Sequence, residues 1–118
     1  MKIGEFIKAV NTTKDTVRHY EDLKLIQPSW KGSVKDYKDK DINDFMAIKE
    51  MKDMGLNLKD IQVIFEVKRN FGCGSPSLLS NIKQKLHHQL YALQEEEKEI
   101  KKKKLNLQET LKELDQLI

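Results

Sequence analysis

Residues 77–118 contain neither glycine nor proline, and their apolar side chains recur at intervals of three and four residues. This spacing is typical of a helix whose apolar stripe packs against another helix. A continuous helix of this length would extend about 60 Å, too far for the preceding residues to cover. We therefore expect a long helix that pairs with a second copy of the chain. Its seam includes Leu79, Ile82, Leu86, Leu90, Leu93, Ile100, Leu107 and Leu111, and continues to Leu114 and Ile118.

Charged residues interrupt and flank this seam. Glu97 and Lys104 stand at two of its positions, and glutamates at 95–97 precede lysines at 101–104. In an antiparallel dimer, blocks of opposite sign can pair between the chains and set their register. The segment could instead fold back as a helical hairpin near residues 101–106, and we favour the single helix.

The preceding residues predict four shorter helices and a hairpin. Helical spacing and capping residues place the helices at about 3–10, 14–23, 39–54 and 58–70. Pro28, Gly32 and Ser33 mark the turn of a small two-stranded wing. The expected architecture is therefore mainly α. It comprises a winged helix-turn-helix domain at residues 1–70, a linker at 71–76 and a dimerisation helix at 77–118.

The bulk properties narrow the class of protein. The chain has 118 residues, a formal net charge of +3 and one cysteine. This size allows one small domain with an appendage, and a single cysteine excludes an internal disulfide framework. No apolar run approaches membrane-spanning length, so we expect a cytoplasmic protein with no membrane partner. The sequence has no phosphate-binding glycine loop and no nucleophile in a motif context. We therefore expect neither an enzyme nor a cofactor.

Residues 11–21 carry the pattern of a helix-turn-helix. Asn11 suits a tight turn, Thr13 is a good helix cap, and the second helix ends in a cationic and aromatic cluster. Such a helix can enter a major groove, and a wing can reach the DNA backbone. The DNA-binding candidates are Thr13, Lys14, Arg18, His19 and Tyr20 on the helix, and Trp30, Lys31, Lys35 and Tyr37 on the wing.

Residues 1 to about 66 resemble the DNA-binding domain of the MerR family of bacterial transcription regulators. The match runs through Ile3-Gly4-Glu5, the run from Thr16 to Glu21, Lys35-Asp36-Tyr37, Asp41-Ile42 and the segment from Gly55 to Ile61. The resemblance implies a homodimer that binds a pseudo-palindromic promoter operator in double-stranded DNA. It also implies that this dimer distorts the promoter spacer, which realigns the promoter for RNA polymerase. Lys52 would contact a further phosphate.

The sequence departs from the family pattern at several of these positions. His19 replaces the first of two tyrosines, Trp30 stands where an arginine is usual, and Lys52 replaces a common arginine. Each change keeps a hydrogen-bond donor or an aromatic ring, so DNA binding is still expected. The operator sequence is the property that these changes affect.

Cys73 is the candidate sensor of a thiol-reactive or other stress signal. It lies between two glycines just ahead of a helix N-terminus, and no second cysteine is available to complete a soft-metal site. We therefore expect no metal site. A linker cysteine without a signalling role remains an alternative. Two other functions also stay open: an architectural or recombination-accessory winged-helix protein, and a coiled-coil adaptor without a DNA role.

Overall fold

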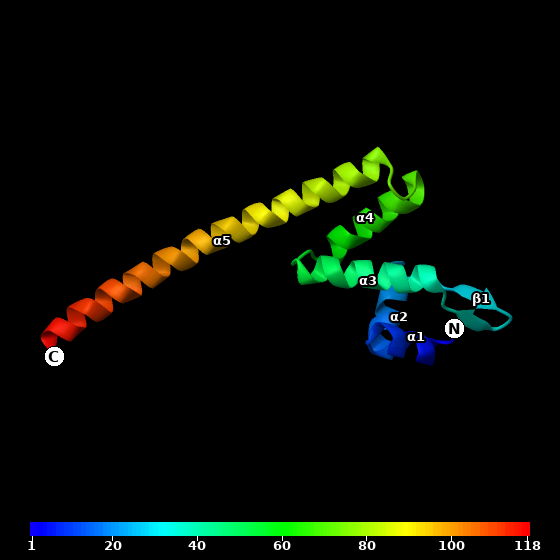
Figure 1. The fold of residues 1–118 in the computed structure, drawn as a ribbon, viewed down its shortest axis with the longest axis horizontal. Helices are drawn as coiled ribbons and strands as arrows, with labels where there is room; N and C mark the ends of the chain where they lie inside the picture. The colour runs from blue at the N-terminus through cyan, green and yellow to red at the C-terminus, as the bar shows by residue number, and fades with distance from the viewer. The chain divides into compact units, whose positions relative to one another are not determined.

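The computed structural model describes the whole chain, Met1–Ile118, as two compact units, Met1–Ile82 and Lys83–Ile118. The order of elements is the expected one, with five helices and one hairpin (Figure 1). Their bounds are α1 Ile3–Val10, α2 Lys14–Asp22, β1 Ser29–Lys31, β2 Val34–Asp36, α3 Asp39–Asp53, α4 Leu58–Phe71 and α5 Pro76–Leu117. The division between the units falls within α5, so this helix contributes to both.

The turn between α1 and α2 forms as its sequence predicts. Asn11 adopts a left-handed backbone with φ 53°, and its N–H donates to the carbonyl oxygens of Ile7 and Lys8. Thr13 then caps α2, because its hydroxyl oxygen accepts a hydrogen bond of 3.2 Å from the N–H of Thr16. A left-handed turn residue followed directly by a cap fixes where α2 begins.

An aromatic cluster forms the core of the first unit. Phe6 of α1 stacks on Tyr37, with ring centroids 4.6 Å apart, and meets the edge of Phe45 of α3 at 6.1 Å. Tyr20 of α2 packs against the same Phe45 at 5.6 Å. Aromatic pairs at these separations stabilise a core beyond the effect of their buried area. The cluster therefore ties α1, α2, α3 and the end of the wing together.

Polar side chains cap the N-termini of α4 and α5. Asn57 accepts a hydrogen bond of 2.8 Å from the N–H of Asp60, and Ser75 accepts one of 3.2 Å from the N–H of Leu78. Within α3, Phe45 and Ile48 are buried. Met46 is exposed, because it stands about 100° around the helix from Phe45.

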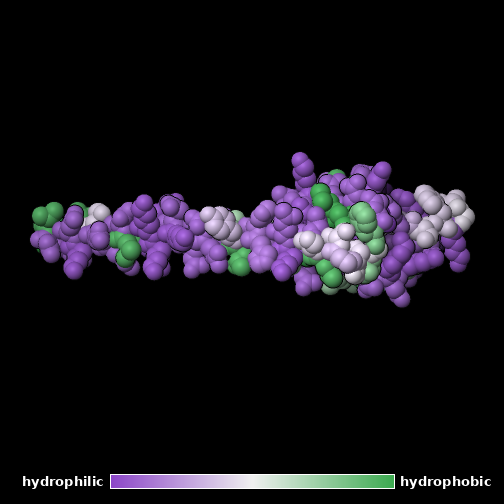
Figure 2. Space-filling view, turned by 90° about the horizontal axis from the view of Figure 1, so that it is seen from above, coloured by the Kyte–Doolittle hydropathy of each residue, from purple (hydrophilic) through white to green (hydrophobic).

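The α5 helix runs unbroken for 42 residues, so the alternative of a helical hairpin is wrong. Every side chain from Leu90 to Ile118 is exposed, the apolar ones included. Figure 2 shows the outer part of this helix as mainly hydrophilic, with separate hydrophobic patches along it. None of the helices combines the length and apolar character that a membrane-spanning segment requires.

Candidate nucleic-acid interface

The exposed face of α2 carries most of the predicted recognition residues. Thr13, Lys14, Arg18 and His19 are exposed, whereas Tyr20 is buried in the core. The hydroxyl of Thr13 is already engaged as the helix cap and lies 2.9 Å from that of Thr16. The side chains of Lys14, Arg18 and His19 therefore take part neither in the core nor in the helix cap.

The wing is a tight antiparallel hairpin. Trp30 pairs with Lys35 across the strands, and Lys31 pairs with Val34, which leaves Gly32 and Ser33 as the two-residue turn. Gly32 has φ 64° at the first turn position, as a type II′ hairpin requires. The Lys35 ammonium lies 5.8 Å from the centre of the Trp30 ring. The turn geometry therefore places Trp30 and Lys35 on the same face of the wing.

Glu21 connects α2 to the wing. One carboxylate oxygen accepts a hydrogen bond of 2.8 Å from the Lys35 ammonium, and the other accepts a hydrogen bond from the Tyr37 hydroxyl. Both contacts are partly buried, where charge-assisted bonds are stronger than in open solvent. Glu21 lies in the family motif, but its role cannot be read from that motif, because its partners lie 14 and 16 residues away.

A groove of about 380 Å³ separates α2 from the wing. It brings together five of the residues predicted to bind DNA, which are Lys14, Arg18, Trp30, Lys35 and Tyr37. Lys2 adds a fourth cation to the lining, and Glu21 is the only carboxylate there. A concave surface with this excess of positive charge attracts phosphate oxygens.

The five other predicted residues lie outside this groove, and Thr13 and Tyr20 among them are described above. Lys31 is exposed beside the turn of the wing, and His19 is exposed on α2 with its ring 6.1 Å from that of Tyr20. Lys52 is exposed in the last turn of α3. These side chains are open to solvent but do not share the concave surface with Arg18.

Tyr37 is buried, although it was predicted to contact the DNA backbone. Its side chain is 1% exposed, and its hydroxyl is committed to Glu21. Burial, followed by the hydrogen bond to the Glu21 carboxylate, raises the pKa of Tyr37 well above its ordinary range. The structure therefore does not support a direct phosphate contact by Tyr37. This residue instead fixes the base of the wing against the core.

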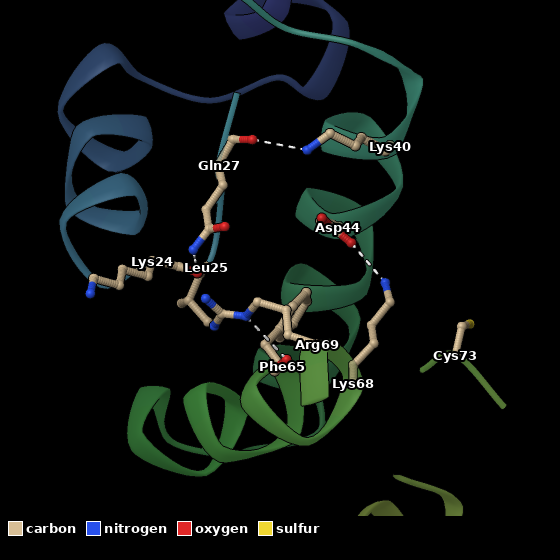
Figure 3. Close-up of a pocket in the computed structure, with 9 residues that line it drawn as sticks. All are labelled: Lys24, Leu25, Gln27, Lys40, Asp44, Phe65, Lys68, Arg69 and Cys73. Atoms are coloured by element: carbon tan, nitrogen blue, oxygen red, sulfur yellow. Dashed lines mark hydrogen bonds and ion pairs between the residues drawn. The ribbon is translucent and has the colours of Figure 1, made fainter. Parts of the chain in front are cut away.

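The segment between α4 and α5 places Cys73 beside a second cavity. Cys73 is an exposed free thiol between Gly72 and Gly74, which have φ values of 92° and 80°. The cavity measures about 200 Å³ and is lined by Lys24, Leu25, Gln27, Lys40, Asp44, Phe65, Lys68, Arg69 and Cys73 (Figure 3).

Two of the cations around this cavity are held by neighbouring groups. The Lys68 ammonium lies 3.0 Å from the Asp44 carboxylate, and the Lys40 ammonium donates to the carbonyl oxygen of Gln27 at 2.9 Å. Elements α3 and α4 thereby share an ion pair at the edge of the cavity that Cys73 borders (Figure 3). No three His, Cys, Asp or Glu side chains gather into a metal site anywhere in the chain.

Comparisons with known proteins agree on one family. The family described as MerR HTH family regulatory protein matches residues 1–68. A crystal structure from Listeria monocytogenes, described as a MerR family transcriptional regulator, superposes with a TM-score of 0.64 at 21% sequence identity. That match covers 98% of this chain and 96% of the other, and at this identity it concerns the fold. No curated protein matches the sequence significantly.

Proposed function

The chain belongs to the MerR family of helix-turn-helix regulatory proteins, and from that premise we propose that it binds a pseudo-palindromic promoter operator as a homodimer. Regulators of this family bind DNA and are not enzymes, so the family assignment agrees with the expectation from the sequence. In our proposal α2 enters the major groove, and the wing contacts the adjacent backbone. RNA polymerase is then affected indirectly, through the shape of the promoter DNA.

The groove between α2 and the wing carries this proposal. Arg18 and Lys14 line it from the helix, whereas Trp30 and Lys35 line it from the wing. Arginine offers a planar fork to phosphate oxygens, and an exposed aromatic ring can pack on the sugar-phosphate backbone. The contact from Lys35 to Glu21 sets the wing relative to α2, so both elements would approach the DNA as one surface.

We further propose that the dimer distorts the promoter spacer. Two half-sites would be contacted at once, and their phosphate contacts would offset a deformation energy of about 1–6 kcal/mol. The exposed apolar seam of α5 supports the dimer.

The decisive test measures DNA binding by fluorescence anisotropy, using the promoter next to the gene for this protein. Replacing Arg18 with Ala should weaken binding equally at matched and scrambled operators, because the side chain is proposed to contact phosphate. The slope of log affinity against log salt should fall by about one. The control is Lys112→Ala, which removes one positive charge from α5, far along the sequence from the groove residues.

The outcomes of this test separate the competing functions. Equal loss at both sequences supports a phosphate role for Arg18, whereas loss at one operator alone would assign it a base contact instead. Retained affinity in Arg18→Ala would contradict a DNA contact by Arg18, whereas a wild-type chain that binds neither sequence would leave the coiled-coil adaptor as the better explanation. Footprinting distinguishes the architectural alternative, since a regulator should protect the spacer between promoter elements.

A further inference from the structure

The cavity beside Cys73 carries more positive charge than the protein neutralises. It lies within the first unit, between the end of α2, the start of α3 and the last turns of α4 (Figure 3). Its cationic lining residues are Lys24, Lys40, Lys68 and Arg69. The one carboxylate of the lining, Asp44, pairs with Lys68, and Lys40 lies 3.5 Å from the carboxylate of Asp41. Lys24 and Arg69 therefore have no acidic partner.

Arg69 presents an unused hydrogen-bonding edge to this cavity. Its Nε–H donates to the carbonyl oxygen of Phe65, one turn earlier in α4, at 3.3 Å. This bond orients the guanidinium, which extends from α4 toward Leu25 (Figure 3). The two terminal amino groups have no partner in the protein. A planar guanidinium with both amino groups free matches the paired oxygens of a phosphate or a carboxylate.

Lys24 occupies a backbone position that glycine normally takes. Its φ is 60°, because it ends α2 in a Schellman turn. The N–H of Lys24 donates to the carbonyl oxygen of Glu21 at 2.9 Å, and the N–H of Leu25 donates to that of Tyr20 at 2.8 Å. A side chain is sterically unfavourable in this left-handed conformation. The lysine adds what a glycine cannot supply here, a charge on a flexible stem at the rim of the cavity (Figure 3).

We propose that this cavity binds a small dianion, the phosphate or dicarboxylate group of a metabolite. Arg69 supplies the paired hydrogen-bond donors, and Lys24 supplies the second positive charge from the rim. The volume of about 200 Å³ sets the size of the ligand, because drug-sized molecules occupy pockets of about 300–1,000 Å³. The cavity shares no lining residue with the groove between α2 and the wing. The anion site is therefore distinct from the surface proposed to bind DNA.

Isothermal titration calorimetry on the full chain tests this site. Inorganic phosphate and succinate are the probes, in separate titrations at constant ionic strength. At least one of them should bind saturably, with one site per chain. Tighter binding of phosphate would assign a phosphorylated ligand, and tighter binding of succinate would assign a dicarboxylate. If neither probe binds saturably, the proposal is wrong.

Variants of Arg69 test how the anion is held. Arg69→Gln should raise the dissociation constant of the bound probe about tenfold, because hydrogen bonds to a charged group are lost. Arg69→Lys keeps the charge without the planar fork, so it should recover only part of the affinity. The control Lys49→Ala removes an exposed cation of α3 that does not line the cavity. Equal weakening in Arg69→Gln and Lys49→Ala would show non-specific attraction and contradict the site.

Lys24→Gly separates a role in binding from a role in folding. The variant should weaken probe binding roughly threefold, since it removes an exposed charge. It should also raise the urea midpoint of unfolding, because glycine adopts a φ of 60° without steric strain. These two effects have opposite signs, so loss of the fold cannot account for the weaker binding. Unchanged affinity in Lys24→Gly would contradict the role of Lys24.

Alkylation of Cys73 locates the bound probe. Cys73 borders the cavity and is the one cysteine of the chain, so a saturating probe should slow its reaction with N-ethylmaleimide. An unchanged rate would place the probe elsewhere and overturn the assignment.

Operator binding in probe-free buffer separates this site from the proposed function. If Arg69→Gln weakens operator affinity as strongly as Arg18→Ala does, the cavity contacts the DNA backbone and the small-ligand proposal is overturned. A chain that binds the probe but no DNA would refute the proposed function and leave the anion site intact.

Discussion

At the scale of single residues, Glu21 shows how one carboxylate organises a binding surface. It accepts hydrogen bonds from Lys35 and Tyr37, so it joins the recognition helix to the second strand of the wing. The ion pair with Glu21 partly neutralises the charge of Lys35. Arg18 and Lys14 are left as the more available cations of the groove.

The environment of Tyr37 predicts a pH effect. Its pKa is raised above the ordinary 10.0, mainly by burial, so the folded state favours the neutral phenol. The resulting stabilisation is complete below about pH 10 and is lost as the pH rises toward the folded-state pKa. In an absorbance titration at alkaline pH, Tyr37 should ionise only as the protein unfolds. Tyr37→Phe is the control, and an unchanged titration curve in that variant would contradict the assignment.

Cys73 offers a second prediction for a single residue. If the exposed thiol senses oxidants or aldehydes, Cys73→Ser should abolish the transcriptional response to them and preserve operator binding in reducing buffer. In vitro transcription with and without mild oxidant measures both properties. Cys73→Ala is a second non-reactive variant and should behave in the same way. A response that persists in both variants would make Cys73 a linker residue without a signalling role.

At the scale of elements, the start of α2 depends on one hydroxyl. Thr13→Ala removes the cap from the N–H of Thr16 and should lower the free energy of unfolding by about 1 kcal/mol. Urea denaturation followed by circular dichroism measures the change. Thr13→Ser keeps the oxygen and should retain most of the stability. Equal losses in the two variants would show that the methyl group of Thr13, rather than its cap, matters.

At the scale of the whole molecule, the proposed function needs two chains. Replacing Leu90 and Leu107 with Asp would place charged side chains in the apolar seam of the proposed dimer. We expect monomers by sedimentation, and a loss of operator affinity on the order of 100-fold, because the two half-sites are no longer bound together. The control replaces Tyr91 and Lys112 with Asp, at exposed positions off the seam. A dimer that survives the Leu90 and Leu107 changes would refute the seam.

Features that depend on neighbouring residues along the chain could be predicted from the amino-acid sequence. Asn11 and Thr13 set the turn before α2, Gly32 set the hairpin, and heptad spacing set α5. Local backbone preferences and helical periodicity act over a few residues, so they can be recognised in the amino-acid sequence.

Tertiary packing, in contrast, determines which of the predicted DNA-binding side chains stay exposed. Tyr37 belongs to the aromatic core with Phe6, and Lys35 is held by Glu21, although both had been expected to reach the backbone. These contacts join residues that are distant in sequence, and their geometry depends on how α1, α2 and the wing pack. No local pattern distinguishes a tyrosine that packs inside from one that faces solvent, because burial is a property of the assembled core.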